Sequence, residues 1–162
     1  MLMKKQLEKT QVMRILDQAG VAYESYCYIE TGVVSGLEVA EVLGQDPDQV
    51  FKTLVTVGHT GEHYVFVVPV SCELDLKKAA DAVGEKSIHM IKSKELLGLT
   101  GYIHGGCSPI GMKKQFVTVV DETAELYDTI CFSAGRIGYQ VQMSVEDLGR
   151  IVPIRFADIT CA

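Results

Sequence analysis

One lysine lies within a strongly apolar segment that is typical of a β-strand. In residues 50–57, strand alternation places Lys52 on the same face as Val50 and Leu54. An ammonium group among apolar side chains must reach solvent, lie at a sheet edge or form an ion pair in a cleft. Two interpretations stay open: an edge lysine that discourages aggregation, and a cation that binds an anion or stabilises developing negative charge.

Two glycine-rich loops could bring backbone close to a ligand. The sequence GGCSPIG spans residues 105–111, and its N–H groups could hold a carboxyl or carbonyl oxygen. The loop SAGRIG at 133–138 has Arg136 near its centre and alone is typical of a hairpin turn. Structural turns use the same residue types, so these loops are weak indications of function.

Cys107, inside the first loop, suggests a nucleophile. No histidine is predictably beside it, because His104 lies three residues away at a strand–loop junction. Lys113 and Lys114 follow the loop and could contact phosphate, or could simply be solvated.

These segments need a scaffold of short strands and helices. Capping patterns and apolar spacing predict helices over residues 5–19, 35–43, 75–83 and 93–98, and one beginning at Ser144. β-prone runs predict strands over residues 22–29, 50–57, 63–70, 87–91, 116–120, 129–132, 139–143 and 151–156. Strands outnumber helices and often form hairpins, which favours an α+β fold: a mixed, barrel-like sheet surrounded by short helices.

Composition limits the class of protein. The chain of 162 residues and 17.8 kDa fits a single domain spanning 1–162, and 48% apolar with 22% charged residues argues against disorder. The densest apolar run, residues 64–70, is too short to span a membrane, and the N-terminus lacks the apolar block of a secretory signal. We therefore expect a cytoplasmic protein without membrane contact.

Charge and cysteine spacing narrow the partners. A net charge of −6 is unusual for a general nucleic-acid binder, so we expect no DNA partner, and any polyanion must meet a local patch. Five cysteines without CxxC spacing predict reduced thiols. His59 and His63 fit a hairpin turn better than a metal site, and no GxGxxG or Walker loop is present. We expect neither a metal nor a cofactor.

Several segments together resemble the YbaK/EbsC-type aminoacyl-tRNA deacylases, relatives of the editing domain inserted in some prolyl-tRNA synthetases. They are VFKTLV at 50–55, PVSCELDLKKAA at 69–80, TGYIHGGCSPIGMKK at 100–114, the SAGRIG loop and RFADIT at 155–160. The resemblance covers nearly the whole chain. It implies a free-standing enzyme that removes cysteine from mischarged Cys-tRNA(Pro), with Cys-tRNA(Cys) as a further substrate, because a synthetase pocket separates similar small side chains poorly.

The resemblance also implies roles for individual residues. Lys52 matches the lysine that the family requires, and substrate contacts are implied at Tyr28, Thr53, Gly105, Gly106, Ser108, Pro109, Gly111, Ser133 and Gly135. Gln140 departs from the pattern, since relatives carry an acidic residue there, and at Cys107 relatives can carry an aliphatic residue.

The family's chemistry is substrate-assisted: the thiol of the bound cysteine attacks its own ester, so that the protein supplies positioning and electrostatics. An aminoacyl-tRNA is the implied partner, and prolyl-tRNA synthetase a further one. Three alternatives stay open: a deacylase for another small aminoacyl-tRNA such as Ala-tRNA(Pro), a non-catalytic tRNA- or synthetase-binding module, and a small-molecule binder.

Overall fold

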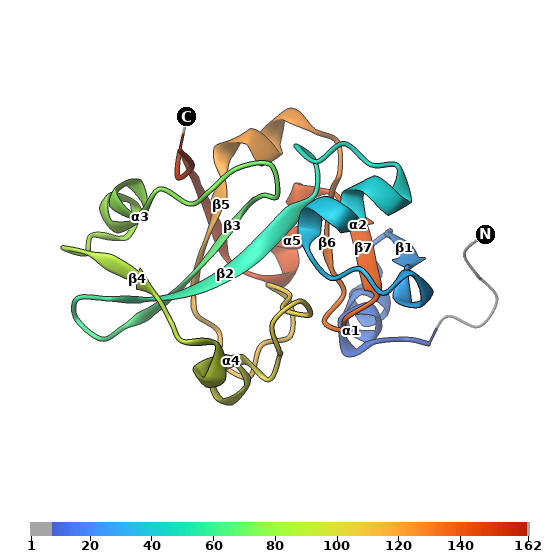
Figure 1. Cartoon of the computed structure of the whole chain (residues 1–162), viewed down its shortest axis with the longest axis horizontal. Coiled ribbons are helices and arrows are strands. Elements are labelled where there is room, and N and C mark those ends of the chain that lie inside the picture. The colour runs from blue at the N-terminus through green and yellow to red at the C-terminus, as the bar shows by residue number, and fades with distance from the viewer. Residues whose placement is uncertain (1–7, 162) are drawn as a thin grey trace.

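The computed structural model describes residues 8–161 and contains two β-sheets with five α-helices packed around them (Figure 1). The helices are α1 (Gln11–Ala19), α2 (Gly36–Leu43), α3 (Leu76–Val83), α4 (Ser93–Thr100) and α5 (Val145–Ile151), with 3₁₀ turns at Ile29–Thr31 and Glu122–Leu126. The strands are β1 (Glu24–Cys27), β2 (Phe51–Gly58), β3 (His63–Pro69), β4 (Ile88–Met90), β5 (Val117–Asp121), β6 (Ile130–Ser133), β7 (Tyr139–Met143) and β8 (Ile154–Ala157).

The sheets confirm the predicted mixed α+β class. The larger has the order β4-β2-β3-β5-β8, antiparallel through β4, β2 and β3 and parallel from β3 to β8. The smaller is antiparallel with the order β1-β7-β6. Only one parallel bridge, Val50 to Cys131, joins them, so within residues 8–161 the sheets do not close into a barrel. The expected barrel-like closure is therefore limited to this contact.

Local sequence signals account for most elements. The β2–β3 and β6–β7 hairpins form as predicted. Ser35, Asp75 and Ser144 cap α2, α3 and α5, each side chain accepting hydrogen bonds from backbone N–H groups of the first turn.

Three predicted elements differ most from the observed ones. Within the described residues, the first helix begins only at Gln11, where Thr10 caps it by accepting from the Met13 N–H, whereas the prediction began at residue 5; residues 5–7 lie outside the described part. The strand predicted over 22–29 ends at Cys27, before the 3₁₀ turn. The last strand starts at residue 154 because α5 extends to Ile151 and Pro153 has no N–H for a ladder.

Strand β3, at the centre of the larger sheet, is buried on both faces. Val65 and Val67 of β3 pack in the main core with α1 and the smaller sheet, while Phe66 and Val68 pack under α3. Burial on both sides explains why β3 is a continuous apolar run. No helix among residues 8–161 has the length and apolarity needed to cross a membrane.

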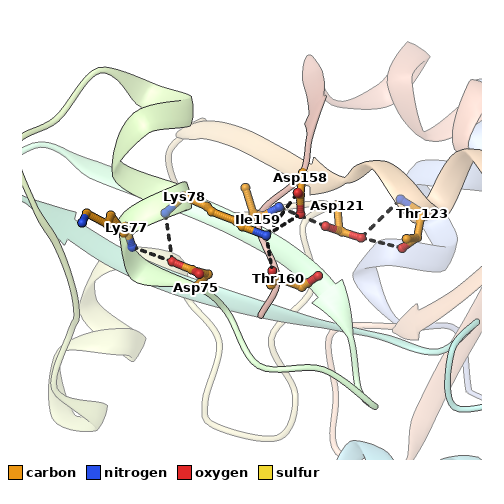
Figure 2. Close-up of polar contacts among 8 residues, drawn as sticks. All are labelled: Asp75, Lys77, Lys78, Asp121, Thr123, Asp158, Ile159 and Thr160. Atoms are coloured by element: carbon orange, nitrogen blue, oxygen red, sulfur yellow. Dashed lines mark hydrogen bonds and ion pairs between the residues drawn. The ribbon is translucent and has the colours of Figure 1, made fainter. Parts of the chain in front are cut away.

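A polar cluster fastens the C-terminal segment to the larger sheet (Figure 2). The buried Asp121 carboxylate accepts hydrogen bonds from the Ile159 N–H at 3.1 Å and the Thr123 N–H at 3.2 Å. Lys78 donates to Asp158 at 3.1 Å and to the Thr160 carbonyl at 2.9 Å. The segment is thereby held beside α3, far from either glycine-rich loop in sequence.

Candidate active site at the junction of the two sheets

A cavity of about 560 Å³ lies along one uncovered edge of β2. That strand pairs with β3 over its whole length, but β4 pairs with its other edge only from Thr56, and β6 is bridged only to Val50, the residue before β2. Between these two points the edge faces the cavity, which residues 50–55 line without a gap. The incomplete junction of the sheets thus creates the site.

The edge presents unpaired backbone groups at Thr53. Val70 N–H donates to the Val50 carbonyl at 2.7 Å, and Ile91 N–H to the Val55 carbonyl at 3.4 Å. Even-numbered residues of β2 therefore bond to β3, and odd-numbered ones point the opposite way. The N–H and carbonyl of Thr53 consequently point to the side that no described strand covers. Its hydroxyl is also buried without a hydrogen-bond partner among the described residues, an arrangement that favours a ligand.

Lys52 brings a positive charge to the same edge. Its Nζ lies 3.8 Å from Oε2 of Glu73, the other charged residue of the cavity lining as described. The side chain of Glu73 is 84% exposed, against 30% for that of Lys52, so the pair is weak and easily exchanged for another anion.

The opposite wall consists of Ser133 and Gln140 of the smaller sheet and of Tyr28, which directly follows β1. Burial raises the pKa of Tyr28, so its hydroxyl keeps its proton at neutral pH. The Ser133 hydroxyl accepts from the Gly135 N–H at 3.1 Å and still has a proton to donate. Gln140 is 2% exposed and exchanges two hydrogen bonds with Gln45, at 2.7 and 2.9 Å.

The beginning of α2 forms a third wall with Val34, Ser35, Gly36 and Leu37. The first backbone N–H groups of a helix lack intrahelical partners and can donate to a ligand, while the Glu38 carboxylate in the same turn offsets their partial positive charge. A side chain at residue 36 is excluded, because its Cβ would lie 2.2 Å from Cγ1 of Val70.

The glycine-rich loop reaches the cavity only at its start. Gly105 and Cys107 line the cavity. The Gly106 N–H is already bonded to the Ile103 carbonyl at 2.9 Å. The Ser108 hydroxyl is fully buried and accepts from the Ile110 N–H at 3.3 Å.

Other glycines of the two loops make room for a buried tyrosine. A Cβ at Gly111 would lie 2.8 Å from the Tyr102 hydroxyl, and one at Gly135 would lie 3.0 Å from the Tyr102 ring. The structure thus brings together five of the predicted site residues, Tyr28, Lys52, Thr53, Gly105 and Ser133; it leaves five outside the lining, Gly106, Ser108, Pro109, Gly111 and Gly135.

Burial opposes a nucleophilic role for Cys107. The residue is 9% exposed, and burial raises the pKa of its thiol to about 12, so that almost no thiolate exists at neutral pH. His104 also lines the cavity, but within residues 8–161 no hydrogen bond joins it to this thiol. No group of three His, Cys, Asp or Glu side chains in that range could hold a metal ion.

Sequence reasoning missed the wall from α2 and the contribution of residues near β4. The sequence indicates that Ser35 is a cap, but a cap does not indicate which way a helix points. Met90, Ile91 and Ser93 line the cavity beside β4 and α4, and Glu73 lies in a loop without a motif. The exposure of Val34 and Leu37 to solvent follows only from the fold.

Comparison with known proteins identifies the family. Residues 32–151 match the aminoacyl-tRNA editing domain, and the chain is 45% identical over 161 residues to EbsC of Enterococcus faecalis, described as a candidate Cys-tRNA(Pro)/Cys-tRNA(Cys) deacylase. That alignment covers 99% of this chain and 98% of the relative. The chain belongs to the aminoacyl-tRNA editing domain family. These matches confirm the predicted family and the predicted enzyme class, an aminoacyl-tRNA deacylase that acts in editing.

Other relatives place the editing domain in a wider group. A proline–tRNA ligase of Pelobacter propionicus is 34% identical over 84 residues, which are 52% of this chain but only 15% of the ligase. Crystal structures of a hypothetical protein and of a candidate trans-editing enzyme for prolyl tRNA synthetase superpose with TM-scores of 0.85 and 0.79. Their identities are 22% and 24%, and each comparison covers 94% of this chain and 100% or 99% of the other. These two likenesses show the fold.

Proposed function

We propose that this editing domain removes cysteine from mischarged Cys-tRNA(Pro), and also from Cys-tRNA(Cys). The observation that carries the proposal is the uncovered β2 edge, where Lys52 and the unpaired groups of Thr53 face one cavity. Its volume of about 560 Å³ is within the usual range for small-molecule sites, roughly 300–1,000 Å³. Only the terminal aminoacyl ester of a tRNA would enter it.

The substrate would supply the nucleophile. In the proposed step, the cysteine sulfur bonds to its own ester carbonyl carbon, and the bond from that carbon to the ribose oxygen breaks. The thiol proton goes to the leaving ribose oxygen, and water later opens the cyclic thiolactone to free cysteine. Holding thiol and ester in one reactive geometry is the protein's main contribution. The protonated state of Cys107 supports a route that needs no protein thiol.

Each lining residue would have a separate task. Lys52 would bind the terminal ribose or its phosphate, exchanging Glu73 for the substrate. The Gly105 N–H, which has no hydrogen-bond partner among the described residues, and the α2 amides would stabilise the carbonyl oxygen as it becomes negative. Thr53, Tyr28 and Ser133 would orient the amino group and the ester.

A second candidate is deacylation of another small aminoacyl-tRNA, such as Ala-tRNA(Pro). The inner wall contains Phe51, Val55, Leu96 and Phe132, which would accept the methyl group of alanine as readily as a thiol. That reaction would need an attacking water or a tRNA hydroxyl in place of the substrate thiol. A tRNA- or synthetase-binding module without turnover is the remaining alternative.

A deacylation assay on one tRNA body charged with cysteine, serine or alanine separates these functions. We expect rapid release of cysteine and, because serine lacks the thiol, release of serine at least about a hundredfold slower, a difference of about 2.7 kcal/mol in activation free energy. Equal rates for cysteine and serine would contradict the thiol route, faster release of alanine would favour the second candidate, and binding without release would favour the module.

Two lysine variants test the site itself. Lys52→Ala should abolish cysteine release, whereas Lys77→Ala, which removes an exposed lysine of α3, should not change it. Full activity of Lys52→Ala would refute the assignment of this edge. The proposed setting is a single domain, residues 1–162, working in the cytoplasm where tRNAs are charged, with prolyl-tRNA synthetase as a further partner.

A further inference from the structure

One segment of this acidic chain is strongly basic. Residues 86–114, which we call the basic lobe, contain five lysines, a single glutamate and no aspartate or arginine, a net charge of +4. The remaining residues carry a net charge of −10, so that the whole chain reaches −6. The lobe consists of β4, α4 and the glycine-rich loop that follows, and α4 lies with the adjoining loops at the lower edge of Figure 1.

The positive charges of the lobe are available to a partner. All five lysines, Lys86, Lys92, Lys94, Lys113 and Lys114, are exposed. The ion pairs within residues 8–161 involve Lys9, Lys52, Lys78, Arg136 and Arg150, and none involves the lobe. The lobe's single carboxylate, that of Glu95, accepts instead from the backbone N–H of Lys92 at 3.2 Å.

The lobe is also a wall of the cavity. Met90, Ile91, Ser93, Leu96 and the start of the glycine-rich loop line it, and Lys92 lies between two of these residues in sequence. Lys113 is fixed beside the end of α4, where its N–H donates to the Thr100 carbonyl at 3.0 Å and its side chain lies against Gly101. The cations of the lobe therefore belong to the same elements that form this wall of the cavity.

We propose that the basic lobe binds the phosphodiester backbone of the acceptor end of the tRNA whose terminal ester enters the cavity. This inference rests on the proposed function. A polyanion is repelled by most of this surface, but charges beyond about 8 Å are largely screened at physiological salt, so the local sign decides the approach. The lobe offers a positive approach that ends at the cavity.

A matched pair of triple variants tests the lobe. Lys94→Gln/Lys113→Gln/Lys114→Gln removes three positive charges from it, and Arg14→Gln/Lys77→Gln/Arg155→Gln removes three exposed ones elsewhere. None of the six residues lines the cavity, so the cavity itself stays intact. For each variant, kcat/KM is measured over a range of salt on Cys-tRNA(Pro) and on 3′-cysteinyl adenosine, an ester without phosphates.

On Cys-tRNA(Pro), we expect the lobe variant to lose roughly tenfold or more in kcat/KM at low salt. Its slope of log kcat/KM against log salt should be shallower by about 2, since each lost single-strand phosphate contact contributes about 0.7. The control variant should keep the wild-type slope, and all three proteins should cleave the adenosine ester equally.

The outcomes separate this inference from the proposed function. If the lobe and control variants lose the same amount of kcat/KM on the tRNA, or if neither loses any, the basic lobe does not bind the tRNA. Cleavage of both esters by the wild type would still support the proposed deacylase. Wild-type cleavage of the tRNA ester no faster than the adenosine ester would also overturn it, since the phosphates would then contribute nothing. If the wild type cleaves neither ester, the proposed function is wrong, and the proposed role of the basic lobe is wrong with it.

Discussion

Adding one methyl group at Gly105 should distort the mouth of the cavity. Gly105 has a φ of +90°, and a Cβ there would lie 2.5 Å from Cγ1 of Val34. Forcing this φ on alanine costs about 1–2 kcal/mol. Val34 is 39% exposed and can turn away, at about 0.5–1.5 kcal/mol if it leaves its rotamer. We expect Gly105→Ala to lose about 2–3 kcal/mol of unfolding free energy, or roughly 5–10 °C in Tm.

Gly84 is a control that shares the positive φ of Gly105 but lacks its steric clash. Gly84 has a φ of +77°, and a methyl group added there would meet no atom within 4 Å, so Gly84→Ala should lose only about 1–2 kcal/mol and keep full activity. Gly105→Ala should in addition lose roughly tenfold or more in kcat/KM, since displacing Val34 changes the lining, and each 1.36 kcal/mol in activation free energy is tenfold.

A double variant locates the cause. Adding Val34→Ala to Gly105→Ala should restore most of kcat/KM and part of the stability, while the cost of the positive φ remains. The measurements are urea unfolding and deacylation of Cys-tRNA(Pro). The reasoning is refuted if Gly105→Ala is fully active and no less stable than Gly84→Ala, or if Val34→Ala restores neither property.

Four further predictions concern buried polar and thiol groups. Gln140→Leu should lose about 1–3 kcal/mol of unfolding free energy, measured in urea, because the amide of Gln45 loses its partner. A double Gln45→Leu/Gln140→Leu variant should recover most of this loss. No recovery would contradict the pairing. Asp121→Ala should lose about 2–3 kcal/mol by releasing the C-terminal segment but leave deacylation unchanged below the melting temperature; a specific loss of kcat would be unexpected. Burial raises the pKa of Cys107 to about 12, so in the native state a thiol reagent at pH 8 should label the exposed Cys161 first, and Cys107 only after unfolding. For the same reason stability should fall as pH rises from about 9 towards 12, because the unfolded chain releases the protons that the folded chain retains on Cys107 and on the likewise buried Cys131; flat stability over that range would contradict this effect of burial.

Short-range signals in the sequence were sufficient for most of the scaffold. Caps such as Ser35 and Asp75, and the alternating or continuous apolar runs of β2 and β3, depend on neighbouring residues only. The way in which the two sheets meet was not predictable in this manner, because it is a contact between Val50 and Cys131, residues 81 positions apart. An open junction and a closed barrel require the same local patterns.

The site was predictable where a residue type is unusual for its surroundings. Lys52 in an apolar strand is such a case, and it lines the cavity. The glycine-rich loop was not, because glycine, serine and proline serve packing as well as binding. Ser108 is bonded to its own loop, and Gly111 makes room for Tyr102, neither of which can be read without the partner segment.

The single bridge between the sheets has a consequence for selectivity. Beside this bridge the buried side chain of Cys131 does not line the cavity, but it packs against Val50 and Val70, which do, so the position of that wall depends on its size. A bulkier residue there would push the walls apart and admit larger esters, with every ligand-contacting residue unchanged. Related proteins with this fold can thus change their amino-acid preference through a residue that lies behind the cavity wall. The ratio of cysteine to alanine release in a Cys131→Leu variant would measure the size of this effect.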